Sequence, residues 1–154
     1  MARAKAEYLV TQSLIDRLVQ QEQWPETRSS SINMYREGLK RDLEWLLNTR
    51  QPVMPELESY PAVSSSIFNF GFPDIHSFDG SAGKEQNALT LSLEKCIQAF
   101  EPRIKHPHVS LTRSDILSRS LRFHIEGQVF YENMDEEIKF DTVLELISGE
   151  YEVK

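Results

Sequence analysis

The chain has 154 residues, of which 40% are hydrophobic and 27% charged, which is typical of one globular domain. Its single cysteine, Cys96, excludes an internal disulfide and any metal site built from several cysteines. No apolar run approaches the roughly 20 residues that span a bilayer, and residues 1–7 lack the apolar core of a secretory signal. We therefore expect a cytoplasmic protein without direct membrane insertion.

The net charge of −7 is concentrated in the C-terminal part of the chain. From Glu126 onward there are nine acidic and two basic residues, whereas the first 125 residues hold fifteen of each sign. Residues 103–122 have the opposite bias, with five Lys or Arg and two His against one Asp. Nucleic-acid binding usually requires a basic field over a whole domain, so we expect no nucleic-acid partner. Polarised charge fits a protein partner better than nucleic acid, because complementary patches guide association, and an ordinary mixed surface is the equal alternative.

The N-terminal 30 residues contain one apolar patch in a polar segment. Leu14, Ile15, Leu18 and Val19 have a spacing that suits one or two helical turns. The residues around them are rich in Gln, Glu, Arg and Ser. This composition predicts a mobile leader over residues 1–30 with one docking segment, followed by a single domain over residues 31–154.

The first long helix is predicted over residues 31–48, with Ser31 as its N-cap. Its apolar residues recur every three or four positions and form one stripe: Ile32, Tyr35, Leu39, Leu43, Leu46 and Leu47. Trp45 falls on a different face, where it is either packed by a loop or presented to a partner.

Residues 51–83 are rich in proline and glycine and are predicted to form a loop. Phe68, Phe70 and Phe72 alternate inside this segment. They form either a buried extended segment or an aromatic binding strip, and burial is the interpretation that their hydrophobicity favours.

A second helix is predicted over residues 84–100, with Cys96 on its apolar face as a small buried hydrophobe. After it the apolar period changes from 3.6 to 2, which is typical of strands. These strands are expected around residues 109–111, 121–131, 138–146 and 151–153, joined by short turns. The predicted fold class is α+β, with two main helices packed on a small antiparallel sheet of three to four strands.

Glu101-Pro102-Arg103 lies between the second helix and the first strand. Pro102 disfavours helical geometry at Glu101, so the helix should end near Phe100. That places a carboxylate at a helix C-terminus, where the dipole prefers cations. Arg103 can form a planar bidentate contact with a carboxylate. The motif is either an exposed pair that stitches a turn or a pair of charges held out for a partner.

Motifs of known catalytic chemistry are absent from the sequence, including GxxxxGK[ST], GxGxxG and HExxH. His106 and His108 could supply two metal nitrogens, but no third ligand lies nearby in the sequence. Cys96 lacks an evident activating histidine, and no second carboxylate is tied to Glu101 by sequence. The sequence therefore predicts no active site and no cofactor.

Several segments resemble the TssE-type baseplate subunits of the bacterial type VI secretion system, in the same order. They are Ser13-Leu-Ile-Asp-Arg-Leu, Asp42-Leu-Glu-Trp-Leu-Leu-Asn-Thr-Arg, Ser66-Ile-Phe-Asn-Phe-Gly-Phe-Pro-Asp, Phe100-Glu-Pro-Arg-Ile, Leu121-Arg-Phe-His-Ile-Glu-Gly and Phe140-Asp-Thr-Val-Leu-Glu-Leu-Ile-Ser-Gly-Glu-Tyr. The third differs from the family's Ser-x-x-x-Tyr-Gly-x-Pro-Asp pattern by having Phe70 in place of tyrosine.

The resemblance implies a structural, non-enzymatic subunit that joins the baseplate wedge and starts growth of the contractile sheath. The implied partners are wedge subunits of the TssF, TssG and TssK types and sheath subunits of the TssB and TssC types. The implied wedge contact is Glu101, Pro102 and Arg103, and Trp45 is a further candidate. The implied sheath contact is the edge of the last strands, with Phe140, Thr142, Leu144, Leu146, Tyr151 and Val153.

Two mutants would test these implied contacts. We expect Arg103→Ala to weaken wedge binding and leave the fold intact. We expect deletion of residues 148–154 to impair sheath assembly but spare wedge binding. Two alternatives stay open: an equivalent subunit of an extracellular contractile particle, and a peptidoglycan hydrolase, since some family members carry a lysozyme-like label.

Overall fold

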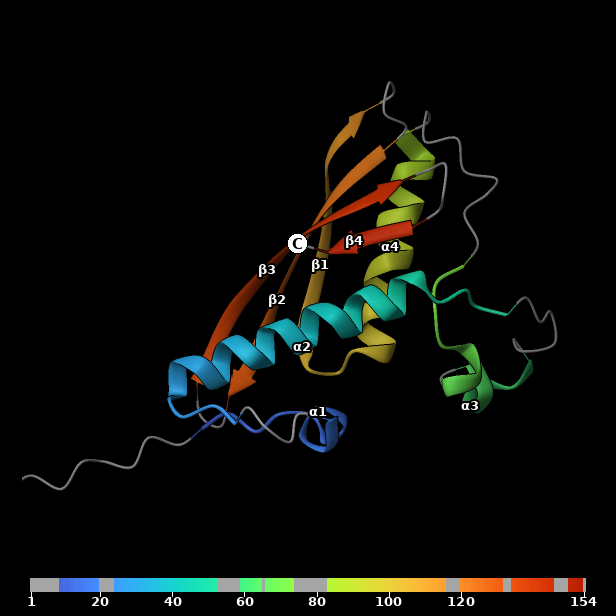
Figure 1. Cartoon of the computed structure of the whole chain (residues 1–154). Helices are drawn as coiled ribbons and strands as arrows, with labels where there is room; N and C mark the ends of the chain where they lie inside the picture. The colour runs from blue at the N-terminus through green and yellow to red at the C-terminus, as the bar shows by residue number, and fades with distance from the viewer. Residues whose placement is uncertain are drawn as a thin grey trace, which may run out of the picture. The chain divides into compact units, whose positions relative to one another are not determined.

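A computed structural model describes residues 9–19, 24–52, 59–64, 66–73, 83–115, 120–131, 134–145 and 150–153. The chain divides into two compact units, residues 1–42 and residues 43–154, and the boundary falls inside a long helix. The helices are α1 (Leu14–Val19), α2 (Arg28–Asn48), α3 (Pro61–Ser64), the 3₁₀ turn η2 (Ile67–Asn69) and α4 (Gly83–Phe100) (Figure 1). None of these helices is long and apolar enough to cross a membrane.

Four antiparallel strands form one sheet in the order β1-β2-β3-β4. The strands are β1 (Ile104–Asp115), β2 (Ser120–Tyr131), β3 (Met134–Glu145) and β4 (Glu150–Val153). β2 and β3 pair along their whole length, whereas β4 reaches only residues 142–145 of β3. The α+β class and the antiparallel sheet are therefore confirmed.

The core of the second unit lies between helices and one face of the sheet. Figure 1 shows α4 running beside the strands, and α4 contacts β1. The core residues come from the end of α2, from α4 and from alternate positions of the strands: Leu43, Leu46, Leu47, Leu89, Leu93, Ile97, Val109, Leu121, Phe123, Ile125, Val129 and Ile138. Cys96 is 7% exposed, so its predicted burial is confirmed.

The start of α2 differs from the predicted one. The helix begins at Arg28, and Thr27 caps it: the Thr27 side chain accepts from the Ser30 N–H at 3.1 Å. Ser31 lies inside the first turns and is fully buried, so its prediction as the N-cap is wrong. The cap moves because Thr27 and Ser30 bond to each other's backbone, which leaves Ser31 to accept the Val10 N–H at 3.0 Å.

β1 is longer than predicted because the chain passes Pro107 through an irregularity. The register with β2 shifts between Lys105 and His108, and His106 has a φ of 51°. Pro107 cannot donate to a ladder, so an interruption of this kind lets the strand continue. Gly127 lies near it on β2, where a Cβ would come within 2.3 Å of the Ile104 side chain.

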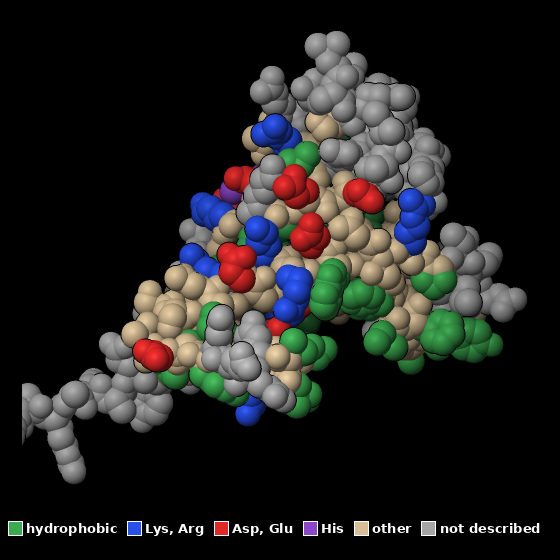
Figure 2. Space-filling view, viewed as in Figure 1, with side chains coloured by type: hydrophobic (Ala, Val, Ile, Leu, Met, Phe, Trp, Pro, Cys, Tyr) green, Lys and Arg blue, Asp and Glu red, His purple; other side chains and the backbone are tan. Residues whose placement is uncertain are grey.

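The aromatic loop is buried at one end and exposed at the other. Phe72 is 3% exposed, but Phe68 is 60% exposed, so burial of all three aromatics is wrong. The turn η2 breaks the expected alternation, and apolar side chains around α3 and η2 reach the surface (Figure 2). Gly71 has a φ of 116° and passes so close to the Thr49 carbonyl that a Cβ would lie 2.4 Å from its oxygen.

Candidate partner-binding sites

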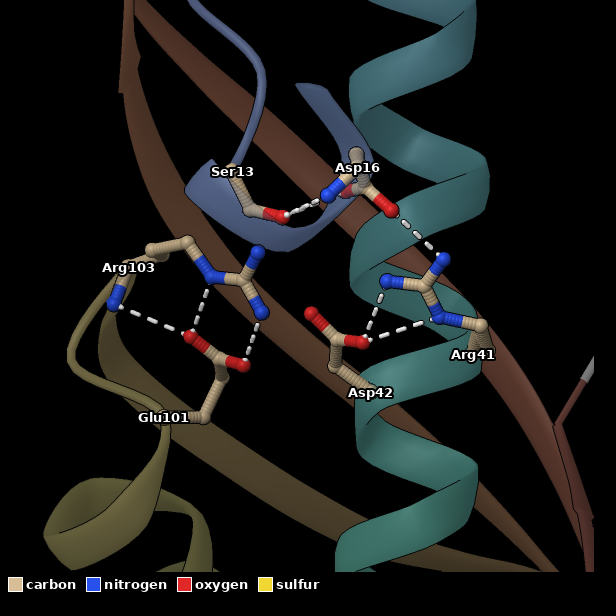
Figure 3. Close-up of polar contacts among 6 residues, drawn as sticks. All are labelled: Ser13, Asp16, Arg41, Asp42, Glu101 and Arg103. Atoms are coloured by element: carbon tan, nitrogen blue, oxygen red, sulfur yellow. Dashed lines mark hydrogen bonds and ion pairs between the residues drawn. The ribbon is translucent and has the colours of Figure 1, made fainter. Parts of the chain in front are cut away.

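Glu101 and Arg103 form a closed ion pair just after α4. The helix ends at Phe100, as predicted, and the Ile104 N–H donates to the Glu101 carbonyl at 3.1 Å to make a turn. The Arg103 Nε donates to Glu101 Oε1 at 2.6 Å, and Nη2 donates to Oε2 at 2.5 Å (Figure 3). The Arg103 backbone N–H also donates to Oε1, at 3.3 Å. The bidentate geometry predicted for this pair is thus formed within the chain itself.

Burial divides this motif into a hidden part and an accessible part. The Glu101 side chain is only 6% exposed, the Arg103 side chain is 26% exposed, and Pro102 is exposed. In this structure Glu101 is buried and paired with Arg103, whose guanidinium compensates a carboxylate at an unfavourable helix end, and the wedge contact of the motif stays a prediction. Arg103→Ala would strand a buried carboxylate, so we no longer expect that variant to leave the fold intact.

Trp45 lies on α2 with 56% of its surface exposed. This exposure is compatible with presentation to a partner, and both expected roles of Trp45 stay predictions. Its carbonyl accepts from the Thr49 hydroxyl at 2.6 Å, which closes the end of α2. Trp45 stays a candidate contact residue.

The proposed sheath-edge side chains point into the core. Phe140, Thr142, Tyr151 and Val153 are between 1% and 7% exposed. They share one face of the sheet because side chains alternate along a strand. A sheath contact through these residues stays a prediction, and it would use their backbone together with the alternate side chains, such as the exposed Glu150 and Glu152. The Leu144 side chain and Leu146 lie outside the described residues.

The outer edge of β4 is already occupied by Asn48, at the end of α2. The Tyr151 N–H donates to Asn48 Oδ1 at 2.8 Å, and Asn48 Nδ2 donates to the Tyr151 carbonyl at 2.9 Å. A partner strand at β4 would have to displace this amide. Within the described strands, the edge of β3 over Met134–Asp141 pairs with β2 on one side and with no strand on the other. Sequence reasoning missed Asn48 because the pair is 103 residues apart.

His108, one of the two candidate metal-binding histidines on β1, contacts α4. His108 Nδ1 lies 2.9 Å from Glu94 Oε1, and the same oxygen accepts the Val109 N–H at 2.8 Å, which ties α4 to β1. No group of three or more His, Cys, Asp or Glu that could hold a metal occurs among the residues that the structure describes.

Comparison with known families places this α+β chain in a class of baseplate proteins. The family model of baseplate wedge protein gp25 matches residues 33–134, which is about two thirds of the chain. The chain therefore belongs to this family, as the resemblance to TssE-type subunits implies. The match includes the Glu101 motif, β1 and β2, whereas α1, nearly all of β3, and β4 lie outside it. No curated protein matches the chain significantly.

Proposed function

We propose that the protein is the TssE-type subunit of a type VI secretion baseplate, which docks to the wedge core and primes polymerisation of the contractile sheath in the cytoplasm. The observation that carries this proposal is the baseplate wedge match over residues 33–134. Its partners would be wedge subunits of the TssF, TssG and TssK types and sheath subunits of the TssB and TssC types. The role is structural, and the family match supports it, together with the pairing of both Glu101 carboxylate oxygens with Arg103.

For wedge docking, the accessible surface of the motif is Pro102 together with the outer part of Arg103. The ion pair gives this surface a fixed shape, because the bidentate contact and the turn bond at Ile104 hold the backbone. A partner would then contact the rigid turn and the partly exposed Arg103 guanidinium, and it would not contact the Glu101 carboxylate.

The double variant Glu101→Met/Arg103→Met separates docking from stability. Replacing both side chains of the pair with apolar ones of similar length removes both charges, so the unfolding free energy should fall less than in either single variant. We expect its affinity for co-expressed wedge subunits to fall at least tenfold, measured by pull-down and by titration. Wild-type affinity in a normally folded variant would assign the pair to the turn alone.

For sheath priming, we propose that a sheath strand pairs with β3 over Lys139–Asp141. The backbone N–H and carbonyl of Tyr151 point away from β3 and bond to Asn48. Tyr151 is paired with Leu144, so the N–H and carbonyl of Leu144 point away from β4 as well. Because backbone direction alternates, Lys139 and Asp141 direct their N–H groups to the side of β3 that faces away from β2. A strand can be added at the edge of a sheet, where it pairs with groups that point in this direction.

Lys139→Pro tests this edge, with Lys139→Ala as its control. Proline removes an edge N–H and keeps the ladder between β2 and β3, and proline is tolerated on edge strands. We expect Lys139→Pro to fold and to bind wedge subunits but to start few sheaths, counted by fluorescence microscopy of a tagged sheath subunit. Equal sheath numbers for both variants would exclude pairing at this site.

A further inference from the structure

The short helix α1 presents its apolar side outward and its acidic residue inward. Leu14, Ile15, Leu18 and Val19 are between 62% and 76% exposed, whereas Asp16 is 6% exposed. These four aliphatic residues lie on one side of the helix, and apolar side chains reach the surface over α1 in Figure 2. This is the reverse of an ordinary surface helix, which buries its apolar stripe.

Polar contacts within the first unit hold α1 in this orientation. The Ser13 hydroxyl caps the helix by accepting the Asp16 N–H at 3.1 Å, and it donates to Asp16 Oδ2 at 2.6 Å. Arg41 on α2 donates to Asp16 Oδ1 at 2.6 Å and is itself fixed by Asp42 at 2.7 Å (Figure 3). Gly38 makes room for this contact, since a Cβ there would lie 3.1 Å from Asp16 Oδ2.

The segment before α1 is also attached to α2 by hydrogen bonds. The Val10 N–H donates to the Ser31 hydroxyl at 3.0 Å, and Gln12 Nε2 donates to the Ser31 carbonyl at 2.9 Å. A six-residue helix has no stability of its own in water, so these contacts are what orders it. They fix which side of α1 faces out, at the expense of leaving four aliphatic side chains in water.

We propose that α1 is a docking helix that inserts into an apolar groove of another baseplate wedge subunit. Helix-in-groove recognition uses apolar anchors on one side of a helix, at positions i, i+3, i+4 and i+7, and Leu14 and Leu18 have the i, i+4 spacing. The inference rests on the proposed function for the identity of the partner. It adds a contact outside the matched family region, which begins at residue 33.

The size of the surface identifies the kind of partner. Four aliphatic side chains are far fewer than the roughly 20–30 residues per side of a stable interface, so α1 would not sustain a dimer of this chain by itself. It suits a secondary contact within an assembly already held by other surfaces. A membrane surface fits less well, because interfacial helices carry a Lys- and Arg-rich polar side facing water. Here that side holds the buried Asp16 and its bond to Arg41.

The test uses the full-length chain and the wedge subunits co-expressed with it. Leu14→Ser/Leu18→Ser should lower the affinity for the wedge complex at least tenfold and leave the melting temperature unchanged, because both side chains are exposed. Leu91→Ser on α4, where the side chain is 55% exposed, is the matched control and should bind normally. Normal binding by the α1 variant, while the unaltered chain binds, would overturn the inference alone.

Three further results would count against it. If the unaltered chain does not bind the wedge subunits, both the proposed function and the inference about α1 are wrong. Concentration-dependent dimers in sedimentation, abolished by the α1 substitutions, would assign the helix to a second copy of the chain. Binding to phosphatidylcholine–phosphatidylglycerol vesicles, abolished by the same substitutions, would assign it to a lipid surface. Site-specific photocrosslinking from position 15 to a wedge subunit would support the inference.

Discussion

At the scale of single residues, two side chains of chemically reactive types, Glu101 and Cys96, are buried and have structural contacts. Glu101 is a carboxylate at a helix C-terminus, which the helix dipole disfavours, and Arg103 compensates it with two side-chain hydrogen bonds. Cys96 donates to the Gly71 carbonyl at 3.3 Å and lies among apolar residues of α4. Neither group is available for the chemistry that its type suggests.

The Cys96 thiol should be unreactive in the folded protein. Burial raises its pKa to about 12, so almost no thiolate forms at neutral pH, and only the thiolate is a nucleophile. We expect a disulfide reagent such as DTNB to label the native chain slowly at pH 8 and one thiol per chain immediately in urea. Rapid labelling without denaturant would show that this part of α4 opens readily.

At the scale of elements, the end of α2 and the terminal strand stabilise each other. Asn48 satisfies both backbone groups of Tyr151, and the Tyr151 ring meets the Phe72 ring edge-on at a centroid distance of 5.8 Å. Deletion of residues 148–154 would therefore remove buried core side chains as well as an edge. This makes the deletion a poor test of sheath priming, and Lys139→Pro is the sharper variant.

Asn48→Ala should destabilise the protein by about 1–3 kcal/mol, because it leaves the Tyr151 N–H and carbonyl without partners at a partly buried site. The amide hydrogen of Tyr151 should also exchange faster. Urea denaturation and hydrogen exchange would measure the two effects. Gln98→Ala, at an exposed position of α4, is the control and should be near neutral. Equal stability of both variants would show that the amide does not hold β4.

At the scale of the whole molecule, the acidic C-terminal strands include a local charge network on the sheet. Glu126 Oε1 lies 3.1 Å from Lys139 Nζ and 3.2 Å from His124 Nε2. On the other side of the ring, His124 Nδ1 lies 2.8 Å from Asp141 Oδ1. The network joins β2 to β3 beside the edge that we assign to sheath pairing. Lys139 is the basic member of this network from β3, in a part of the chain where acidic residues predominate.

This network predicts a contribution to stability that is lost in acid. The hydrogen bond and charge of Lys139 lower the pKa of Glu126, with a smaller effect of His124. Because the folded pKa is depressed, the stabilisation is present above the unfolded value of about 4.3 and disappears as the pH falls through the lower folded value. Glu126→Gln should therefore lose less stability between pH 6 and pH 3 than the wild type, in urea titrations. Glu37→Gln is the exposed control, and identical profiles for wild type and Glu126→Gln would refute the effect.

The sequence by itself determined the elements whose signals are local. Pro102 ends α4, the alternation after Ile104 defines strands, and the apolar face of α4 buries Cys96, all through interactions between near neighbours. Only the tertiary structure decided which groups stay accessible, because that depends on contacts between distant residues. Asn48 closes the β4 edge from 103 positions away, and Arg41 holds Asp16 from 25 positions away. Residue type and hydrophobic period predict which side of a helix or strand is apolar. Contacts with residues distant in the sequence decide whether that side is buried or exposed.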